Sequence, residues 1–290
     1  MKKRALVLFK GGLGNQIFTL NFIKFLEKNN FKVFAITDFY KSSQISSLNT
    51  EKREFYLDLN SYNTNRINSK LIINLISVLL NQKNKKFYKK IFSKIINSLI
   101  EIVEDVNLIN MKKNKFIFIF DGYWQSYDLL MPDIELRNLL SKDKKFNFFN
   151  NFKVEKNSIA IHIRRSDYLN LKEELSVDYY IKAINYCKEN IEDFKFTIFT
   201  DDIQWVKNNE IFNNINNINV ALKENTVKDF ISMAKCGNHI ISNSTYSYLA
   251  AYINLNPKGI TLAPYPWFKN LKFIDYDKIQ NPNWLGIENE

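Results

Sequence analysis

Cysteine and glycine are scarce in this chain. Its 290 residues include two cysteines, Cys187 and Cys236, which lie far apart in the sequence. They form no C-x-x-C pair for metal or redox chemistry and are too few for a disulfide framework. We therefore expect two reduced, buried thiols in a cytoplasmic protein. Because there are only seven glycines, a cluster of them marks a place where the backbone has a special task.

Long hydrophobic runs are also missing. No stretch approaches the roughly 20 apolar residues that cross a bilayer. The basic start, residues 1–4, is followed by an apolar run that Lys10 ends, and this run is too short for a secretory signal. The formal net charge is +11, but the sequence holds no nucleic-acid recognition motif. We interpret the charge as solvated surface and predict no nucleic-acid partner.

Apolar strands alternate with helical patterns along both halves of the chain, which predicts an α/β protein. The expected strands are 5–9, 31–36, 116–120, 158–164, 196–200, 239–242 and 260–263. The expected helices are 16–28, about 71–106, 177–190, 203–207, 226–234 and 246–253. A polar segment near residue 150 is the expected boundary. The sequence therefore predicts two Rossmann-like domains, 1–150 with a helical insertion at about 71–106, and 151–290, facing each other across a cleft.

The most informative segment is 159–168, which reads IAIHIRRSDY. Isoleucine alternates with other residues, so the segment is expected to be a half-buried strand with His162 and Arg164 on one face. Arg165 then points the other way and is expected to anchor Asp167 or the loop. Two arginines at the carboxyl end of a parallel strand suit a phosphate or diphosphate. An ion pair between Arg165 and Asp167 is the alternative interpretation.

Other polar groups follow predicted strands. The block Gly11 to Gln16 reads GGLGNQ. Its glycines would let a ligand approach the N-terminus of a helix closely, or they form only a tight turn between a strand and a helix. The segment Asn243 to Ser247 holds several small polar side chains at a strand-to-helix turn, a suitable seat for phosphate. Tyr123 and Trp124 follow the strand 116–120, either as core aromatics or as a platform for a sugar ring.

Three acidic residues have a competing structural interpretation. Asp202 is expected to cap the helix 203–207, and no other acidic cluster accompanies Asp201 and Asp202, so we predict no metal there. Asp229 lies three residues after Thr226, which matches a capping box.

A lysine-rich stretch interleaves basic and apolar residues. Its members are Lys83, Lys85, Lys86, Lys89, Lys90 and Lys94, with Phe87, Ile91, Phe92 and Ile95 between them. The pattern is typical of a basic amphipathic helix on anionic lipid, and equally of a solvated helix packed on the body of the protein.

Taken together, these segments resemble the α-1,2-fucosyltransferases of glycosyltransferase family 11. The resemblance lies in five blocks, which occur in the family's order: GGLGNQ at 11–16, GYWQS at 122–126, HIRRSDY at 162–168, FTDD at 199–202 and NSTYS at 243–247. Ser166 stands where the family usually has glycine, and Thr245, Tyr246, Tyr248 and Leu249 also depart from its pattern. These departures leave the acceptor and the linkage open.

The resemblance implies a GT-B fold and an inverting, metal-independent transfer of L-fucose from GDP-β-L-fucose to a terminal galactose. It implies catalytic roles for Arg164, His162, Asp167 and Asn15, with no general base singled out. Donor binding is expected from Gly12, Gly14, Arg164, Arg165, Asp229, Asn243, Ser244 and Thr245. Acceptor binding is expected from Gln16, Tyr123, Trp124 and Gln125. The expected partners are GDP-fucose and a galactose-terminated or lipid-linked glycan, with peripheral contact to an anionic membrane.

Three alternatives stay open at this point. The first is a fucosyltransferase that forms another linkage, and the second is a transferase that uses another GDP-sugar. In a different class, it is a non-catalytic protein that binds nucleotide sugars or glycans on the same scaffold. Such a protein would be expected to lose the paired arginines, and both are present here.

Overall fold

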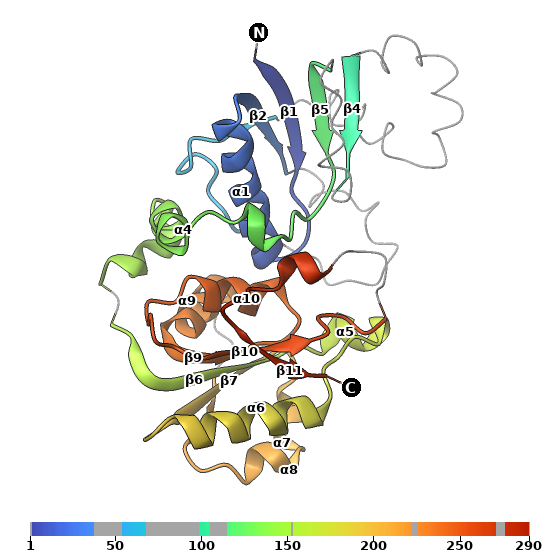
Figure 1. The fold of residues 1–290 in the computed structure, drawn as a ribbon. Coiled ribbons are helices and arrows are strands. Elements are labelled where there is room, and N and C mark those ends of the chain that lie inside the picture. The colour runs from blue at the N-terminus through green and yellow to red at the C-terminus, as the bar shows by residue number, and fades with distance from the viewer. Residues whose placement is uncertain are drawn as a thin grey trace. The chain divides into compact units, whose positions relative to one another are not determined.

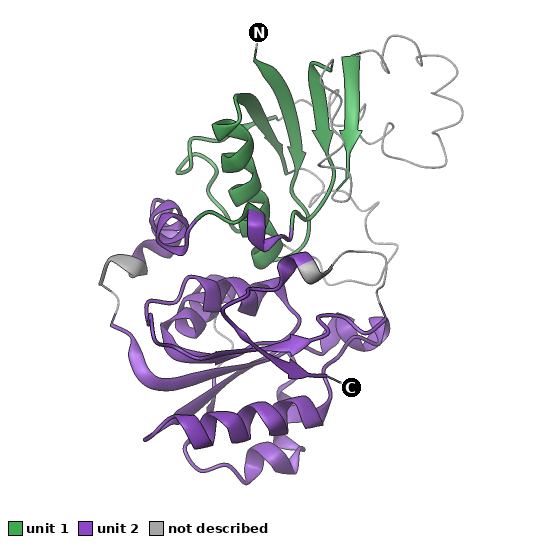
Figure 2. Ribbon diagram, in the orientation of Figure 1, with its two compact units in different colours: residues 1–124, 129–131 green, residues 125–128, 132–290 purple. Residues whose placement is uncertain are grey.

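The computed structural model describes residues 2–37, 54–67, 99–104, 115–151, 153–221, 225–270 and 276–289. The chain divides into two compact units, residues 1–124 with 129–131, and residues 125–128 with 132–290 (Figure 2). Each unit carries a parallel sheet with helices against it (Figure 1). The two α/β domains of the predicted GT-B class are therefore confirmed.

The first unit contains a five-stranded sheet in the order β3-β2-β1-β5-β4. Every pair in it is parallel. Its elements are β1 (Lys3–Leu8), α1 (Leu13–Lys28), β2 (Phe31–Ile36), β3 (Asn65–Arg66), β4 (Ile100–Val103) and β5 (Ile117–Phe120). The predicted helical insertion is wrong at its end, because residues 100–103 form β4 beside β5. The rest of that insertion, with the lysine-rich stretch, lies largely outside the described residues.

The second unit contains a six-stranded parallel sheet in the order β11-β10-β9-β6-β7-β8. Its strands are β6 (Glu155–Ile163), β7 (Lys195–Thr200), β8 (Ile218–Val220), β9 (Cys236–Ile240), β10 (Thr261–Tyr265) and β11 (Leu285–Glu288). Its helices are α4 (Asp133–Leu140), α5 (Ser166–Leu171), α6 (Val177–Asn190), α7 (Ile203–Lys207), α8 (Glu210–Asn213), α9 (Thr226–Lys235) and α10 (Thr245–Tyr252). Its short 3-10 turns are η6 (Lys144–Asn151) and η7 (Tyr276–Ile279), and a further one, η5 (Tyr127–Leu129), spans the division between the units.

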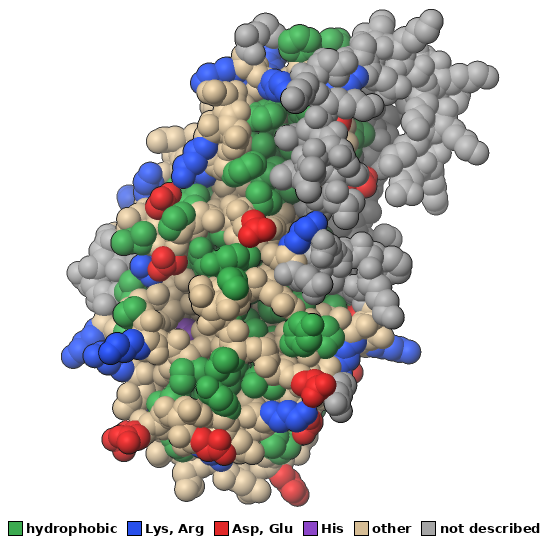
Figure 3. Space-filling view, viewed as in Figure 1, with side chains coloured by type: hydrophobic (Ala, Val, Ile, Leu, Met, Phe, Trp, Pro, Cys, Tyr) green, Lys and Arg blue, Asp and Glu red, His purple; other side chains and the backbone are tan. Residues whose placement is uncertain are grey.

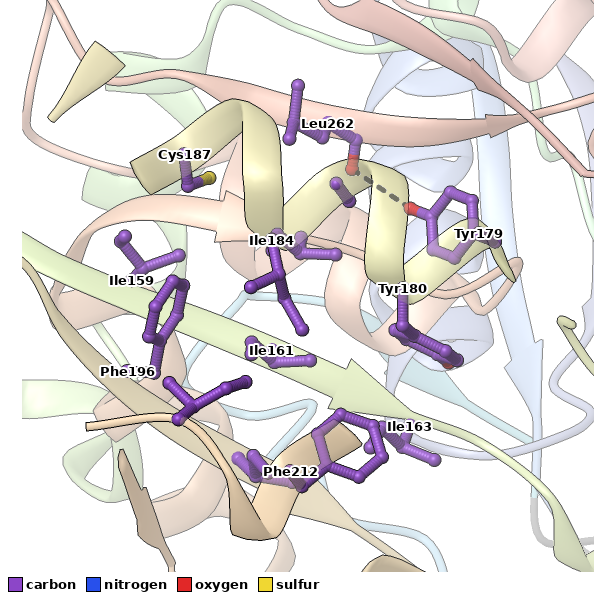
Figure 4. Close-up of a cluster of buried hydrophobic side chains, with 14 of the residues drawn as sticks. Ile159, Ile161, Ile163, Tyr179, Tyr180, Ile184, Cys187, Phe196, Phe212 and Leu262 are labelled. Atoms are coloured by element: carbon purple, nitrogen blue, oxygen red, sulfur yellow. Dashed lines mark hydrogen bonds between the residues drawn. The ribbon is translucent and has the colours of Figure 1, made fainter. Parts of the chain in front are cut away.

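Helices cover both faces of this second sheet. Helix α6, followed by α7 and α8, lies on one face, and α9 and α10 lie on the other (Figure 1). The isoleucines of β6 point to the α6 side, where they meet Tyr180, Ile184 and Phe212 in a buried cluster (Figure 4). Since side chains alternate along a strand, His162 must face the α9 and α10 side.

Both cysteines are buried and free, as predicted. Burial raises the pKa of each thiol to about 12, so neither is a thiolate at neutral pH. Cys187 packs with the isoleucines of β6 (Figure 4). These thiols are core residues rather than nucleophiles.

The boundary between the units falls earlier than the predicted position near residue 150. Residues 132–150 belong to the second unit, because the helix α4 and the turn η6 pack on it. Arg137 on α4 donates to the carbonyl oxygens of Ile253 and Asn254 at 3.2 and 2.8 Å. The ring of Phe146 contacts that of Phe230 edge-on.

Two features concern the surface charge and the hydropathy of the helices. On the face shown in Figure 3, lysine and arginine side chains are spread out rather than gathered in one stripe. Among the described helices, none is both long enough and apolar enough to cross a membrane.

Candidate active site

Each sheet has a point where the chain changes direction between neighbouring strands. In the second unit it lies between β6 and β9, because α6 leads from β6 to β7 on one side and β9 pairs on the other. In the first unit it lies between β1 and β5. Parallel α/β sheets bind ligands at the carboxyl ends of such strands. Most of the predicted site residues lie in the loops that come directly after the strands at these two points.

In the second unit, the loops after β6, β7 and β9 bring most of the predicted donor-binding residues together. Arg164 and Arg165 follow β6, Asp201 and Asp202 follow β7, and residues 241–244 follow β9. Tyr168 joins two of these loops, because its hydroxyl donates to the carbonyl oxygen of Asn243 at 2.9 Å. The segments 162–168 and 243–245 therefore lie side by side at the end of the sheet.

Arg164 lies between two carboxylates. Its Nη2 is 2.5 Å from Oδ1 of Asp167, and its Nη1 is 2.8 Å from Oδ2 of Asp201. Burial alone would lower the pKa of Arg164, but these two carboxylates outweigh it and the net pKa is raised. The guanidinium group is therefore permanently charged and held in one orientation. It has five N–H donors, so two contacts leave donors for a ligand.

Of the two roles expected for Arg165, anchoring Asp167 or anchoring the loop, the first is wrong. Asp167 pairs with Arg164 instead. Arg165 pairs through Nε with Asp202 at 3.3 Å, and its guanidinium carbon lies 4.2 Å from the ring centre of Trp205. Helix α5 begins immediately after Arg165, and Asp167, in its first turn, is three residues after Arg164. That spacing puts Asp167 on the Arg164 side of the loop.

The two carboxylates after β7 are already engaged by cationic and N–H groups. Asp202 accepts from the backbone N–H of Trp205 and caps α7, as predicted. Asp201 contacts Arg164 and accepts from the backbone N–H of Arg165. Within the described residues, no group of three or more His, Cys, Asp and Glu side chains is placed to hold a metal. This donor set does not suit a divalent cation, because each carboxylate already has a positive partner.

His162 is buried against α10. Its Nδ1 lies 2.7 Å from Oγ of Ser242 and 2.9 Å from Oγ of Ser247. Burial, and then the charge of Arg164, lower the pKa of His162 to about 3. Because its unperturbed pKa is 6.5, the ring stays neutral at physiological pH. A group with so low a pKa is a poor general base.

The loop after β9 is shaped by buried hydrogen bonds. Asn243 is 1% exposed, and its Nδ2 donates to the carbonyl oxygen of Glu173 at 2.7 Å. Its Oδ1 is buried with no hydrogen-bond partner among the described residues. Ser244 caps α10, and Thr245 begins that helix. The loop therefore presents a helix N-terminus and an amide oxygen whose acceptor capacity is unused.

The predicted capping box at α9 is wrong. The capping residue is Asn225, whose Oδ1 accepts from the backbone N–H groups of Val227 and Lys228. The helix thus begins one residue earlier than a box with Thr226 as its cap requires, which moves Asp229 past the capping position. Asp229 is half-buried, and the next residue, Phe230, packs on Tyr246 of α10. Asp229 therefore stays a predicted donor-binding residue.

In the first unit, the turn after β1 requires glycine at one position. Gly11 has φ = +72°, and a Cβ there would lie 2.3 Å from Nδ2 of Asn15. The turn leads into α1, whose capping residue, Gly12, offers no side chain to the first N–H groups. Gly12, Gly14 and Asn15 lie at this helix N-terminus and stay predicted ligand contacts. Lys10 and Asp121 form an ion pair across the same strand ends.

Gln16 is not available to an acceptor. It is 0% exposed, and its Nε2 donates to the carbonyl oxygens of Gly11 and Glu54 at 3.2 and 2.8 Å. Its Oε1 accepts from the backbone N–H of Tyr56 at 2.9 Å. The predicted acceptor-binding role of Gln16 is therefore wrong, because this amide holds the glycine turn to the segment 54–56.

Trp124 is a core residue rather than a sugar platform. It is 2% exposed, and its ring stacks on Phe22 of α1 with centroids 4.0 Å apart and planes 8° apart. Its φ of +57° is unusual for a bulky residue, and turns the ring inward. Tyr123, at 38% exposed, and the half-buried Gln125 stay predicted acceptor contacts.

Asp201 and Ser242 were not predicted to take part in the site, and Ser247 was predicted only as part of the segment 243–247. Asp201 orients Arg164, and Ser242 and Ser247 contact His162. The parallel pairing of β6 with β7 and β9 could have indicated them, because residues that follow paired strands meet at one edge. The sequence alone does not give the strand order that decides which loops are neighbours.

Comparison with known proteins gives a family and two relatives. The profile of glycosyl transferase family 11 matches residues 5–288. The chain is 35% identical over 140 residues to an alpha-1,2-colitosyltransferase of Escherichia coli, covering 46% of this chain and 48% of that protein. The match thus spans about half the length of that relative. This chain is also 26% identical over 304 residues to the O-antigen biosynthesis glycosyltransferase WbnK of Escherichia coli, and the match covers 96% of this chain and 98% of WbnK.

Solved structures share the fold. A fucosyltransferase, NodZ from Bradyrhizobium, matches with a TM-score of 0.50 at 10% identity, over 90% of this chain and 95% of that one. The NodZ alpha-1,6-fucosyltransferase crystallised with GDP matches with a TM-score of 0.51 over the same shares, also at 10% identity. At this identity the likeness concerns the arrangement of strands and helices.

Proposed function

Because the chain belongs to glycosyl transferase family 11, we propose that it transfers L-fucose from GDP-β-L-fucose to the 2-hydroxyl of a terminal galactose. The acceptor is a glycan of the lipopolysaccharide or O-antigen type, and the transfer inverts the anomeric centre without a metal ion. The observation that carries the proposal is Arg164, a half-buried cation fixed between Asp167 and Asp201 where β6 ends. The named activity of WbnK supports the class of acceptor.

The proposed chemistry uses this fixed charge. The bond between fucose C1 and the diphosphate oxygen breaks, and a bond forms from the acceptor oxygen to C1. Negative charge builds on the departing GDP, and a preoriented guanidinium group stabilises it without rearranging. Arg165 and the loop 243–245 are proposed to bind the same diphosphate, with Asp229 at the ribose or base.

The acceptor proton is proposed to leave with the diphosphate. His162 is a weak base because its pKa is about 3, and Asp167 is held by Arg164. A phosphate oxygen beside the reacting carbon is therefore the proposed proton acceptor. Asn15 is proposed to orient the acceptor hydroxyl.

A second donor is favoured by one observation. The relative at 35% identity is named as a colitosyltransferase, and colitose is fucose without its 3-hydroxyl. A site that hydrogen-bonds the 3-hydroxyl would reject the deoxy sugar strongly, whereas an apolar site would accept both. GDP-colitose is therefore the second candidate donor.

One assay separates these candidates. Purified protein is incubated with GDP-fucose or GDP-colitose and a panel of galactosides, and the product linkage is determined. We expect a 1,2-linked product, with GDP-fucose the faster donor. A product with another linkage, or faster transfer from GDP-colitose, would replace the proposed specificity. Nucleotide-sugar binding without any transfer would favour the non-catalytic alternative.

Peripheral membrane contact is a further part of the proposal. It rests on the lysine-rich stretch 83–95, which lies outside the described residues. Each lysine near an anionic surface contributes on the order of 1 kcal/mol, so the association would be sensitive to salt. Co-sedimentation with anionic vesicles at low salt would support it, and no sedimentation would exclude it.

A further inference from the structure

Two serine hydroxyls converge on one nitrogen of His162. Nδ1 lies 2.7 Å from Oγ of Ser242, which follows β9, and 2.9 Å from Oγ of Ser247 on α10. Both serines are 0% exposed. In a neutral imidazole, Nδ1 carries either the hydrogen or a lone pair, and the hydroxyl partners decide which.

The two hydroxyl hydrogens have different acceptors. The hydroxyl of Ser247 can donate to the carbonyl oxygens of Ser244 at 3.2 Å or Ser242 at 3.4 Å. Across the described ranges, the hydroxyl of Ser242 has Nδ1 of His162 as its acceptor and no other. A buried hydroxyl hydrogen without a partner costs about 1–3 kcal/mol.

This difference fixes the tautomer. If Nδ1 carried the hydrogen, it would donate to a serine oxygen and leave the Ser242 hydroxyl hydrogen unpaired. If Nδ1 carries the lone pair, Ser242 donates to it and Ser247 donates to a carbonyl oxygen, so both hydrogens are satisfied. The single hydrogen of the ring then lies on Nε2, which has no hydrogen-bond partner among the residues that the structure describes.

We propose that Ser242 is a positioning residue that holds His162 as the Nε2–H tautomer. His162 then donates a hydrogen bond to the bound nucleotide sugar and does not take the proton from the acceptor hydroxyl. The identity of the ligand rests on the proposed function, whereas the tautomer does not. The ring is neutral at physiological pH, because its pKa lies far below 6.5, so it carries one hydrogen and has a single tautomer to assign.

The chain is well suited to a direct test, because it has two histidines. The tautomer of each is read from long-range proton–nitrogen correlations of the protein labelled with ¹⁵N-histidine at neutral pH. His239 is the internal reference, because its Nε2 lies 3.0 Å from the carbonyl oxygen of Met233, which can only accept. A His162→Asn variant assigns the signals.

We expect Nε2–H for both histidines in the wild type. In Ser242→Ala, His162 is expected to shift to the Nδ1–H form, because the oxygen of Ser247 is then its remaining partner and can accept. Ser247→Ala, the matched control, is expected to leave Nε2–H in place, and His239 should not change in either variant. A wild-type His162 with its hydrogen on Nδ1, or an unchanged tautomer in Ser242→Ala, would overturn the proposal.

Adding GDP tests the contact with the ligand. We expect the ¹⁵N chemical shift of Nε2 in His162 to change on saturation with GDP, and that of His239 to remain the same. If calorimetry shows that GDP binds but the signal of His162 does not move, the donor role is wrong. If GDP does not bind at all, the proposed function fails while the tautomer result stands.

Discussion

Replacing Arg164 with alanine is expected to reduce sugar transfer by about 100-fold to 1,000-fold or more, the range seen when one preorganised donor to a developing oxyanion is lost. Arg164→Lys is also expected to be poor, because one ammonium group cannot reproduce two separate N–H contacts with Asp167 and Asp201. The measurement is the turnover of purified variants with GDP-fucose. The fold should persist, with lower stability, since two carboxylates lose their partner.

The control must separate lost catalysis from lost stability. Arg137 in the second unit is a matched choice, because it pairs with Asp133 at 2.9 Å and its side chain is only 13% exposed. Arg137→Ala should lower the unfolding midpoint yet keep most of the turnover. A folded Arg164→Ala variant with near-normal turnover would contradict the role of Arg164. So would equal losses of turnover in both variants.

Replacing Trp124 with alanine is expected to destabilise the first unit by about 3–5 kcal/mol, the usual cost of removing a large buried aromatic ring. The ring fills the space between Phe22 and Phe120, and its loss leaves a cavity that the strand and helix cannot close. Denaturant unfolding followed by far-UV circular dichroism measures the change.

The neighbouring residue supplies the comparison. Tyr123 is 38% exposed, so Tyr123→Ala should change stability by about 0.5 kcal/mol or less. A Trp124→Ala variant as stable as the wild type, but with weakened binding of the acceptor, would restore the platform interpretation that the packing of this ring excludes.

Local patterns predicted the elements of the second unit well. Helix α6 spans Val177–Asn190 and α7 spans Ile203–Lys207, as expected from the apolar period and from the capping residue Asp202. The alternation in β6 placed His162 on the face opposite the isoleucines, because strand geometry is local. The strand β4 was missed, because its four residues, which read IEIV, are too few for their period to distinguish a strand from part of a helix.

Side-chain partners were predicted less well, because they depend on contacts far apart in the sequence. Gln16 looked like a ligand donor, but it is occupied by the backbone of Glu54 and Tyr56, about 40 residues away. Asp201 was interpreted apart from Arg164, although β7 pairs with β6 and brings them together. The inward turn of Trp124 depends on a positive φ that its residue type does not favour.

The central claim is a GDP-sugar site that Arg164 builds without a metal ion. Calorimetric titration of GDP into the protein in the presence of EDTA tests it most directly. We predict saturable binding of GDP to one site, with an affinity that EDTA does not change. Arg164→Ala should weaken this binding, and Arg137→Ala should leave it as in the wild type. Binding that EDTA abolishes, or binding that is indifferent to Arg164, would contradict it.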